Sequence, residues 1–168
     1  MTATEAAATT VVVGLGEWVV SKDPDATLVC LGLGSCVALC AYDPVAKVAG
    51  MAHFVLPHSA EGRNAGPGAK FVDTGIPLLI RELERRGAAR SRLVLKIVGG
   101  ARMITGPGVN GALNIGDRNV ASARTTLSAL GLPIAAEETG GVRGRTVRLH
   151  VGTGVLTVSA AGESGRPL

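Results

Sequence analysis

Aromatic residues are nearly absent from this sequence: Phe, Tyr and Trp make up 2% of its 168 residues. The hydrophobic core must therefore be built from Val, Leu, Ile and Ala. The shortage also bears on five arginines that cluster in one stretch, because proteins that bind single-stranded nucleic acid interleave such charges with aromatic rings. These arginines are Arg81, Arg85, Arg86, Arg90 and Arg92. We interpret them as a solvated basic helix face, with an acidic protein partner as the alternative, and we expect no nucleic acid partner.

Long apolar runs are missing as well. No stretch approaches the roughly 18–20 apolar residues that span a bilayer, and the N-terminal residues lack the basic segment of a signal peptide. The sequence has 3 cysteines, an odd number that argues against a disulfide framework. We therefore expect a cytoplasmic protein with free thiols and no membrane insertion.

The remaining composition indicates a globular domain. Hydrophobic residues make up 46% of the chain, 24 residues are glycine, and the net charge is +4. This composition is typical of a folded chain rich in turns and not of a disordered one. The length fits one domain over residues 1–168, and we expect its core at residues 10–160 and frayed termini.

Short aliphatic and β-branched runs, bounded by glycine, proline and aspartate, predict a strand-rich α/β fold. The expected strands are 10–13, 17–20, 26–33, 37–42, 48–55, 93–98, 134–138, 146–151 and 155–160. Glycine-rich loops are expected at 59–70 and 99–116.

Two helices are expected between these strands. The first has Asp73 or Thr74 as its N-cap, Pro77 in its first turn and Gly87 at its C-terminal stop. The second covers residues 117–130.

One cysteine and one histidine stand where we expect them to meet. Cys36 follows the turn Leu-Gly-Leu-Gly-Ser at the start of strand 37–42, and His53 lies towards the end of strand 48–55. The short connection between these strands predicts a hairpin, in which the start of one strand lies beside the end of the other. A thiol beside an imidazole is the minimum equipment for acyl chemistry through a thioester.

Other known sequence motifs of catalytic and ligand-binding sites do not match this chain. Segment 32–37 lacks the third glycine of a dinucleotide-binding loop, no Gly-Lys-Ser/Thr phosphate loop occurs, and Ser35 is not in a Gly-x-Ser-x-Gly turn. Three cysteines and two histidines are candidate zinc ligands: Cys30, Cys36, Cys40, His53 and His58. They include no Cys-x2-Cys pair, and strands would hold them in a line, so we expect no metal. Cys40 is interpreted as a small buried hydrophobe.

Further polar residues are interpreted as structural. His58 and His150 are expected at the surface. Asn114, Asp117 and Asn119 are expected to be cap and turn residues, with substrate binding as a secondary role.

A series of short motifs runs in one order through most of the chain. They are Gly-Leu-Gly-Ser-Cys-Val at 32–37 with Tyr-Asp-Pro at 42–44, Met-Ala-His at 51–53 with Leu-Pro at 56–57, Phe-Val-Asp-Thr at 71–74, Lys-Ile-Val-Gly-Gly-Ala at 96–101, Asn-Ile-Gly-Asp-Arg-Asn at 114–119, Gly-Gly-Val-Arg-Gly-Arg at 140–145 and Thr-Gly at 153–154. With this set the chain resembles the CheD family, the chemoreceptor glutamine deamidases of chemotaxis. The resemblance implies a layered α/β/β sandwich with mixed, largely antiparallel sheets and two main helices.

The resemblance also implies the roles of individual residues. Cys36 is expected to be the nucleophile and His53 its base. The family's third catalytic residue is a threonine six residues before the cysteine, where this chain has Cys30. A thiol is a poor hydrogen-bonding group, so either Cys30 or a backbone carbonyl orients the imidazole, and we favour the carbonyl. A reversible disulfide between Cys30 and Cys36 is conceivable, and Gly34 and Ser35 are candidates for substrate binding.

The substrate implied by the resemblance is a glutamine side chain in the cytoplasmic domain of a methyl-accepting chemotaxis receptor. Deamidation would convert it to glutamate and release ammonia, with no cofactor. The family also binds the CheC phosphatase, so the alternative function is a non-catalytic regulator that acts by binding CheC. The cysteine at position 30 is the feature that favours this alternative.

Overall fold

The structure, a computed structural model, describes residues 7–62, 68–107 and 114–168. Its strands are β1 (Thr9–Val12), β2 (Trp18–Ser21), β3 (Ala26–Leu33), β4 (Val37–Asp43), β5 (Val48–Phe54), β6 (Val94–Gly99), β7 (Ala136–Thr139), β8 (Arg145–His150), β9 (Leu156–Ala160) and β10 (Arg166–Pro167). Its helices are α1 (Val72–Arg85) and α2 (Ile115–Ala129), with short 3-10 turns η1 (Ser59–Glu61) and η2 (Arg90–Arg92).

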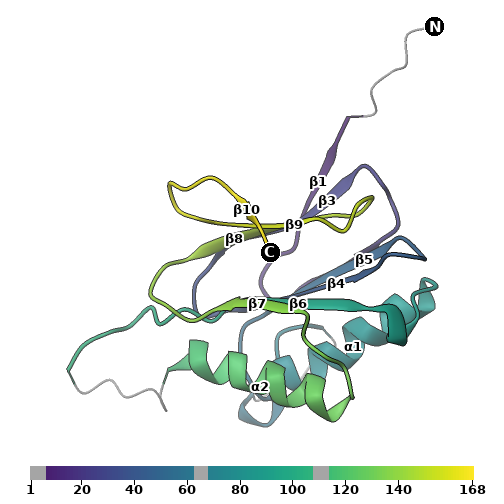
Figure 1. Ribbon diagram of the computed structural model, residues 1–168. Helices are drawn as coiled ribbons and strands as arrows, with labels where there is room; N and C mark the ends of the chain where they lie inside the picture. Colours follow the sequence, from purple (N-terminus) through teal and green to yellow (C-terminus); the bar gives the residue numbers. More distant parts are fainter. Residues whose placement is uncertain (1–6, 63–67, 108–113) are drawn as a thin grey trace, which may run out of the picture.

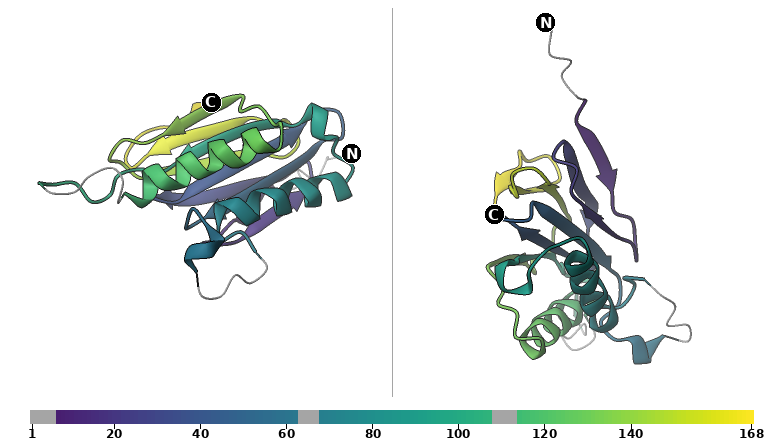
Figure 2. Two further views of the ribbon diagram at one scale, coloured as in Figure 1. Left: turned by 90° about the horizontal axis from the view of Figure 1, so that it is seen from below. Right: turned by 90° about the vertical axis from the view of Figure 1, so that its right-hand side faces the viewer.

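These elements form three layers (Figure 1). The middle sheet has the strand order β2-β5-β4-β6-β7, and the outer sheet has the order β1-β3-β8-β9-β10. Among the described strands only β1 with β3 and β6 with β7 pair in parallel. Both helices cover the face of the middle sheet that points away from the outer sheet (Figure 2). The expected α/β/β sandwich with mixed, largely antiparallel sheets is confirmed.

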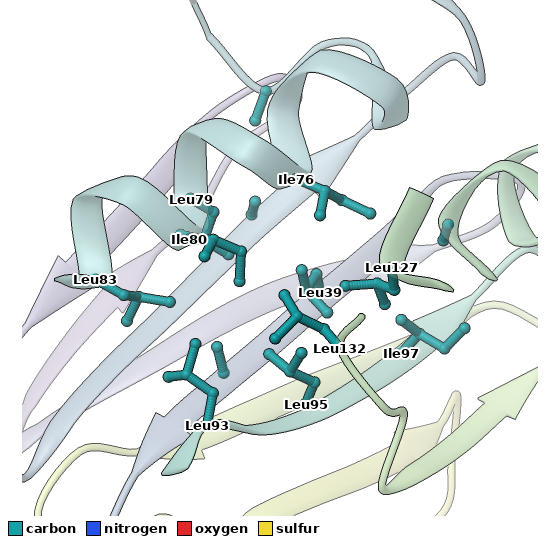
Figure 3. Packing of buried hydrophobic residues seen from close by; sticks show 14 of the residues in the cluster. Leu39, Ile76, Leu79, Ile80, Leu83, Leu93, Leu95, Ile97, Leu127 and Leu132 are labelled. Carbon is teal, nitrogen blue, oxygen red and sulfur yellow. The ribbon is translucent and has the colours of Figure 1, made fainter. Parts of the chain in front are cut away.

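The core has one half on each face of the middle sheet, and strand β4 contributes to both. Val37 and Leu39 pack with the helices, whereas Ala38 and Cys40 pack against the outer sheet. Every residue of β4 is buried, because neither of its faces meets solvent. Figure 3 shows the helix side of this core, where aliphatic side chains of α1 lie over those of β4 and β6. The core is aliphatic, as the composition requires.

Helix α1 differs from the expectation at its start. It begins at Val72, and Phe71 is the cap residue, with no side-chain cap. Asp73 is therefore not the cap: it lies in the first turn, where its carboxylate accepts hydrogen bonds from the backbone N–H and hydroxyl of Ser59. Pro77 lies inside the helix and not in its first turn. The stop at Gly87 is confirmed, with a left-handed φ of 98°.

Two further boundaries differ. Helix α2 begins at Ile115, because the side chain of Asn114 accepts a hydrogen bond from Gly116 N at 3.0 Å and caps the helix. The last residues include a strand that the sequence did not predict: β10 pairs with β9, and Leu168 N donates to Leu156 O at 3.0 Å. This pairing gives the last residues a partner that local sequence does not reveal. The predicted loops 59–70 and 99–116 extend partly outside the described residues.

No helix in the described part of the chain is long and apolar enough to cross a membrane.

Candidate functional site

Cys36 lies in the turn that carries the chain from β3 in the outer sheet to β4 in the middle sheet. The loop after β6 holds this turn through the main chain, since Gly100 N donates to Cys36 O and Ala101 N donates to Gly34 O, both at 2.8 Å. Gly99 has a φ of 114°, and a Cβ on it would lie 2.3 Å from Cys36 O. Glycine is therefore required at this point for the loop to approach the cysteine.

The predicted hairpin is confirmed, and its register supports the expectation that Cys36 and His53 are neighbours. Strands β4 and β5 are an antiparallel pair in which Ala38 lies opposite His53. Cys36 is two residues before Ala38, so it lies on the same face of the sheet and diagonal to His53. Cys36 is half-buried and packs against the cluster between the two sheets. The two groups therefore share one end of the space between the layers.

The imidazole of His53 is held by a main-chain carbonyl. His53 is buried, and its Nδ1 lies 3.1 Å from the carbonyl oxygen of Val13. A carbonyl only accepts hydrogen bonds, so Nδ1 carries the proton and Nε2 has a free lone pair. Among the described residues Nε2 has no hydrogen-bond partner. This is the tautomer in which Nε2 can accept a proton.

Cys30 touches the same carbonyl. Its Sγ lies 3.6 Å from Val13 O and 3.4 Å from the Sδ of Met51, and the residue is fully buried. The expectation that a backbone carbonyl orients His53 therefore has its geometry in Val13. No residue type marks Val13 for this role, because a main-chain carbonyl is present at every residue.

Burial keeps both members of the cysteine–histidine pair neutral. It raises the pKa of the Cys36 thiol above its ordinary 9.0. It lowers the pKa of His53 below 6.5, against the opposing effects of the Val13 hydrogen bond and the negative charge of Glu17. Burial, with a smaller contribution from nearby Cys36, raises the pKa of Cys30 to about 12. The resting pair is therefore a thiol and an uncharged imidazole, not a preformed ion pair.

The turn before Cys36 is made of residues with small side chains. Gly34 and Ser35 are half-buried, and the side chain of Met103 lies against Gly34, where a Cβ would come within 3.1 Å of it. Within the described residues the Cys36 backbone N–H donates to no protein acceptor. An amide proton without an acceptor beside a nucleophile is available to a developing oxyanion.

Asn119 has a different place from the one expected. It is not a cap or turn residue but lies inside α2, fully buried, and its Nδ2 donates to Ser35 O at 2.9 Å and to Val55 O at 3.0 Å. Asn114 is the cap, as expected, and Asp117 pairs with Arg102. The role of Asn119 was missed because it depends on contacts with two other segments of the chain.

The remaining candidates stay apart from this pair or are structural. His58 is exposed, and His150 is half-buried, with its Nδ1 3.1 Å from the hydroxyl of Thr153. Cys40 is buried in β4, as expected, and all 3 cysteines are free. No group of three or more His, Cys, Asp or Glu side chains suited to a metal occurs in the described ranges.

Known proteins match this chain over most of its length. A family model described as CheD chemotactic sensory transduction matches residues 55–160. A protein of Symbiobacterium thermophilum named probable chemoreceptor glutamine deamidase CheD is 46% identical over 93% of this chain and 95% of its own length. The chemoreceptor glutamine deamidase CheD of Thermotoga maritima is 46% identical over 90% of this chain and 92% of its own.

A third relative, a probable chemoreceptor glutamine deamidase CheD of Desulforamulus reducens, is 45% identical over 89% of this chain and 90% of its own length. Identity at this level over nearly the whole of both chains establishes common ancestry. The chain belongs to the CheD family.

Proposed function

We propose that this chain is a chemoreceptor glutamine deamidase that hydrolyses the side-chain amide of receptor glutamines through a Cys36 thioester. Relatives that match nearly the whole chain carry this activity in their names. The observation that carries the proposal for the site is the state of His53. Its Nδ1 is bound to Val13 O, and its Nε2 is buried and free on the face that it shares with Cys36.

The first half-reaction forms the thioester. As the sulfur of Cys36 attacks the carboxamide carbon of glutamine, Nε2 of His53 accepts the thiol proton. The carbonyl oxygen becomes an oxyanion, and the unpaired Cys36 N–H donates to it. One such donor contributes about 3 kcal/mol to the transition state. The imidazolium then gives its proton to the amide nitrogen, the C–N bond breaks and ammonia leaves.

The second half-reaction hydrolyses the thioester. His53 accepts a proton from water, the resulting hydroxide attacks the acyl carbon, and the sulfur leaves and recovers its proton from the imidazolium. The product is glutamate, with one more negative charge than the glutamine that it replaces. Throughout the cycle the Val13 carbonyl accepts from Nδ1 and so stabilises the imidazolium each time it forms.

The proposed substrates are cytoplasmic domains of methyl-accepting chemotaxis receptors, which would place the enzyme in the cytoplasm. Binding of the CheC phosphatase is part of the same proposal. Regulation by CheC binding without turnover is the second candidate, and the cysteine at position 30 favours it. The contact between Val13 O and His53 supplies an orienting group that does not depend on that side chain, and so it supports catalysis.

The test is to incubate the protein with a receptor cytoplasmic fragment and to map glutamine-to-glutamate conversion by mass spectrometry, with ammonia release measured in parallel. Conversion by the native chain and none by Cys36→Ala is the expected result. A native chain that binds CheC but converts no glutamine would instead establish the non-catalytic role.

A further inference from the structure

Asn119 connects the two strand ends that carry the catalytic pair. Its Nδ2 donates to the carbonyl of Ser35, the residue before Cys36, and to the carbonyl of Val55, two residues after His53. Both partners are carbonyl oxygens, which only accept, so the amide orientation follows from chemistry: the opposite orientation would set three oxygens against one another. One side chain of α2 thus contacts both the cysteine turn and the segment that follows the histidine strand.

The hydrogen bond to the Ser35 carbonyl also fixes the direction in which the next backbone N–H, that of Cys36, points. In a trans peptide the C=O and the following N–H point in opposite directions. Because Asn119 holds the Ser35 carbonyl towards α2, the Cys36 N–H points away from the helix. This is the N–H that donates to no acceptor within the described part of the protein. The same side chain therefore orients the donor on which the oxyanion depends.

Helix propensity does not explain an asparagine at this position. Asn is a poor residue for a helix interior, and this one is the fifth residue of α2, just past the first turn, with no exposed surface. Its Oδ1 is buried and has no hydrogen-bond partner among the described residues, which costs free energy of folding. A residue that breaks local rules of stability and touches the site indicates a functional constraint.

We propose that Asn119 is a positioning residue for the deamidation reaction: it holds the Ser35–Cys36 peptide so that the Cys36 N–H meets the oxyanion. The inference rests on the proposed function, because an oxyanion forms only if Cys36 attacks an acyl carbon.

The first experiment compares substitutions on one face of α2. Asn119→Leu keeps the number of side-chain heavy atoms and the branch at Cγ but removes both N–H donors, and Asn119→Ala removes the donors and most of the side chain. Ser122→Ala is the matched control, since Ser122 is one turn away, equally buried, and donates to the Pro57 carbonyl at 2.8 Å without touching the cysteine turn. On a small glutamine peptide we expect kcat to fall about 10- to 100-fold in both Asn119 variants, the range for a misplaced catalytic group, with KM within about twofold. Ser122→Ala should keep its kcat.

The second experiment separates positioning from general loosening of the site. Iodoacetamide alkylates the cysteine thiolate by displacing iodide and forms no oxyanion, so its rate at Cys36 reports the thiol and His53 alone. In Asn119→Leu the rate and its pH dependence should match those of the native protein while deamidation falls. Native kcat in Asn119→Leu, an equal loss in Ser122→Ala, or alkylation that falls in step with kcat would each overturn the proposal.

A third measurement needs no substitution, in case the Asn119 variants do not fold. A peptide in which the glutamine side chain is replaced by the corresponding aldehyde adds the thiol of Cys36 and presents a tetrahedral oxygen to the site. We expect the amide proton of Cys36 to move downfield in the NMR spectrum on addition. An unmoved Cys36 amide signal would overturn the inference. Native protein without deamidase activity would instead refute the proposed function, so the two failures are distinguishable.

Discussion

The carbonyl oxygen of Val13 accepts a hydrogen bond from Nδ1 of His53 at 3.1 Å, and the thiol of Cys30 lies 3.6 Å from the same oxygen. The imidazole is thus oriented by the main chain, and the residue at position 30 is a neighbour of the orienting group, not the group itself. A thiol is a weak hydrogen-bonding group, but it is sufficient at position 30, because the Val13 carbonyl orients His53 without help from that side chain.

Replacement of Cys30 should therefore have little effect on chemistry. We expect Cys30→Ala to keep most of its turnover and to lose about 1 kcal/mol of stability from the space left beside Met51. Cys30→Thr should be nearly neutral in turnover. Steady-state deamidation rates and urea unfolding measure the two effects. A folded Cys30→Ala protein that loses two or more orders of magnitude in turnover would place Cys30 in the catalytic machinery.

Replacement of Cys36 should have the opposite effect: loss of activity with little change in stability. Cys36 is half-buried in a turn, so Cys36→Ala should abolish deamidation and change the free energy of unfolding by less than about 1 kcal/mol. Cys40→Ala is the control, because Cys40 is buried on the same face of β4 but four residues further along the chain than Cys36. This variant should keep its activity and lose stability. Full activity in Cys36→Ala would eliminate the thioester mechanism.

The pH dependence of the reaction should follow the lowered pKa of His53. Burial holds that pKa below 6.5, so the imidazole stays neutral and able to accept a proton to a lower pH than an exposed histidine. We expect the acid limb of kcat/KM on a small peptide to be centred below pH 6.5. Burial raises the pKa of the Cys36 thiol, so its alkylation by iodoacetamide should still be rising at pH 9. An acid limb centred above pH 6.5 would contradict the neutral resting pair.

Asp43 should be important for stability and not for chemistry. The carboxylate is fully buried at the end of β4 and accepts hydrogen bonds from Val45 N, Ala46 N, Ala89 N and the guanidinium of Arg92. Burial alone would raise the pKa of Asp43, but these donors together hold it well below its usual range.

Asp43→Ala leaves the same donors without an acceptor, so we expect a loss of about 3 kcal/mol in urea unfolding with unchanged kcat at a temperature where the variant is folded. Glu82→Ala removes only the pair with the exposed Arg85 and should cost less than about 1 kcal/mol. Equal losses in the two variants would show that the carboxylate of Asp43 has no special role.

The basic face of α1 should not take part in the chemistry. Arg81 and Arg85 are exposed on the side of α1 opposite to its buried residues, and Arg86 is the exposed cap residue that follows the helix. Changing all three to glutamine should leave turnover of a small glutamine peptide intact, whereas a loss confined to a receptor fragment would identify the face as a docking surface. A large drop on the peptide would show that the arginines act in the site.

The sequence by itself determined the parts of this protein that local pattern encodes. The boundaries 26–33 match β3, and the hairpin of β4 and β5 follows from two apolar runs joined by Asp-Pro. That hairpin was enough to bring Cys36 and His53 together, because antiparallel pairing with a short connection leaves little freedom in register.

Only the tertiary structure decided what surrounds the pair. Val13 and His53 are 40 residues apart in the chain, and Asn119 and Ser35 are 84 apart. The groups that Val13 and Ser35 contribute are main-chain carbonyls, which every residue has, so no residue type marks them in the sequence. Asn119 resembles a cap residue in its local context, and the pairing of β10 with β9 lies beyond a polar turn. These contacts form only when the layers pack together. The local residue pattern of one segment does not specify which distant segment it will contact.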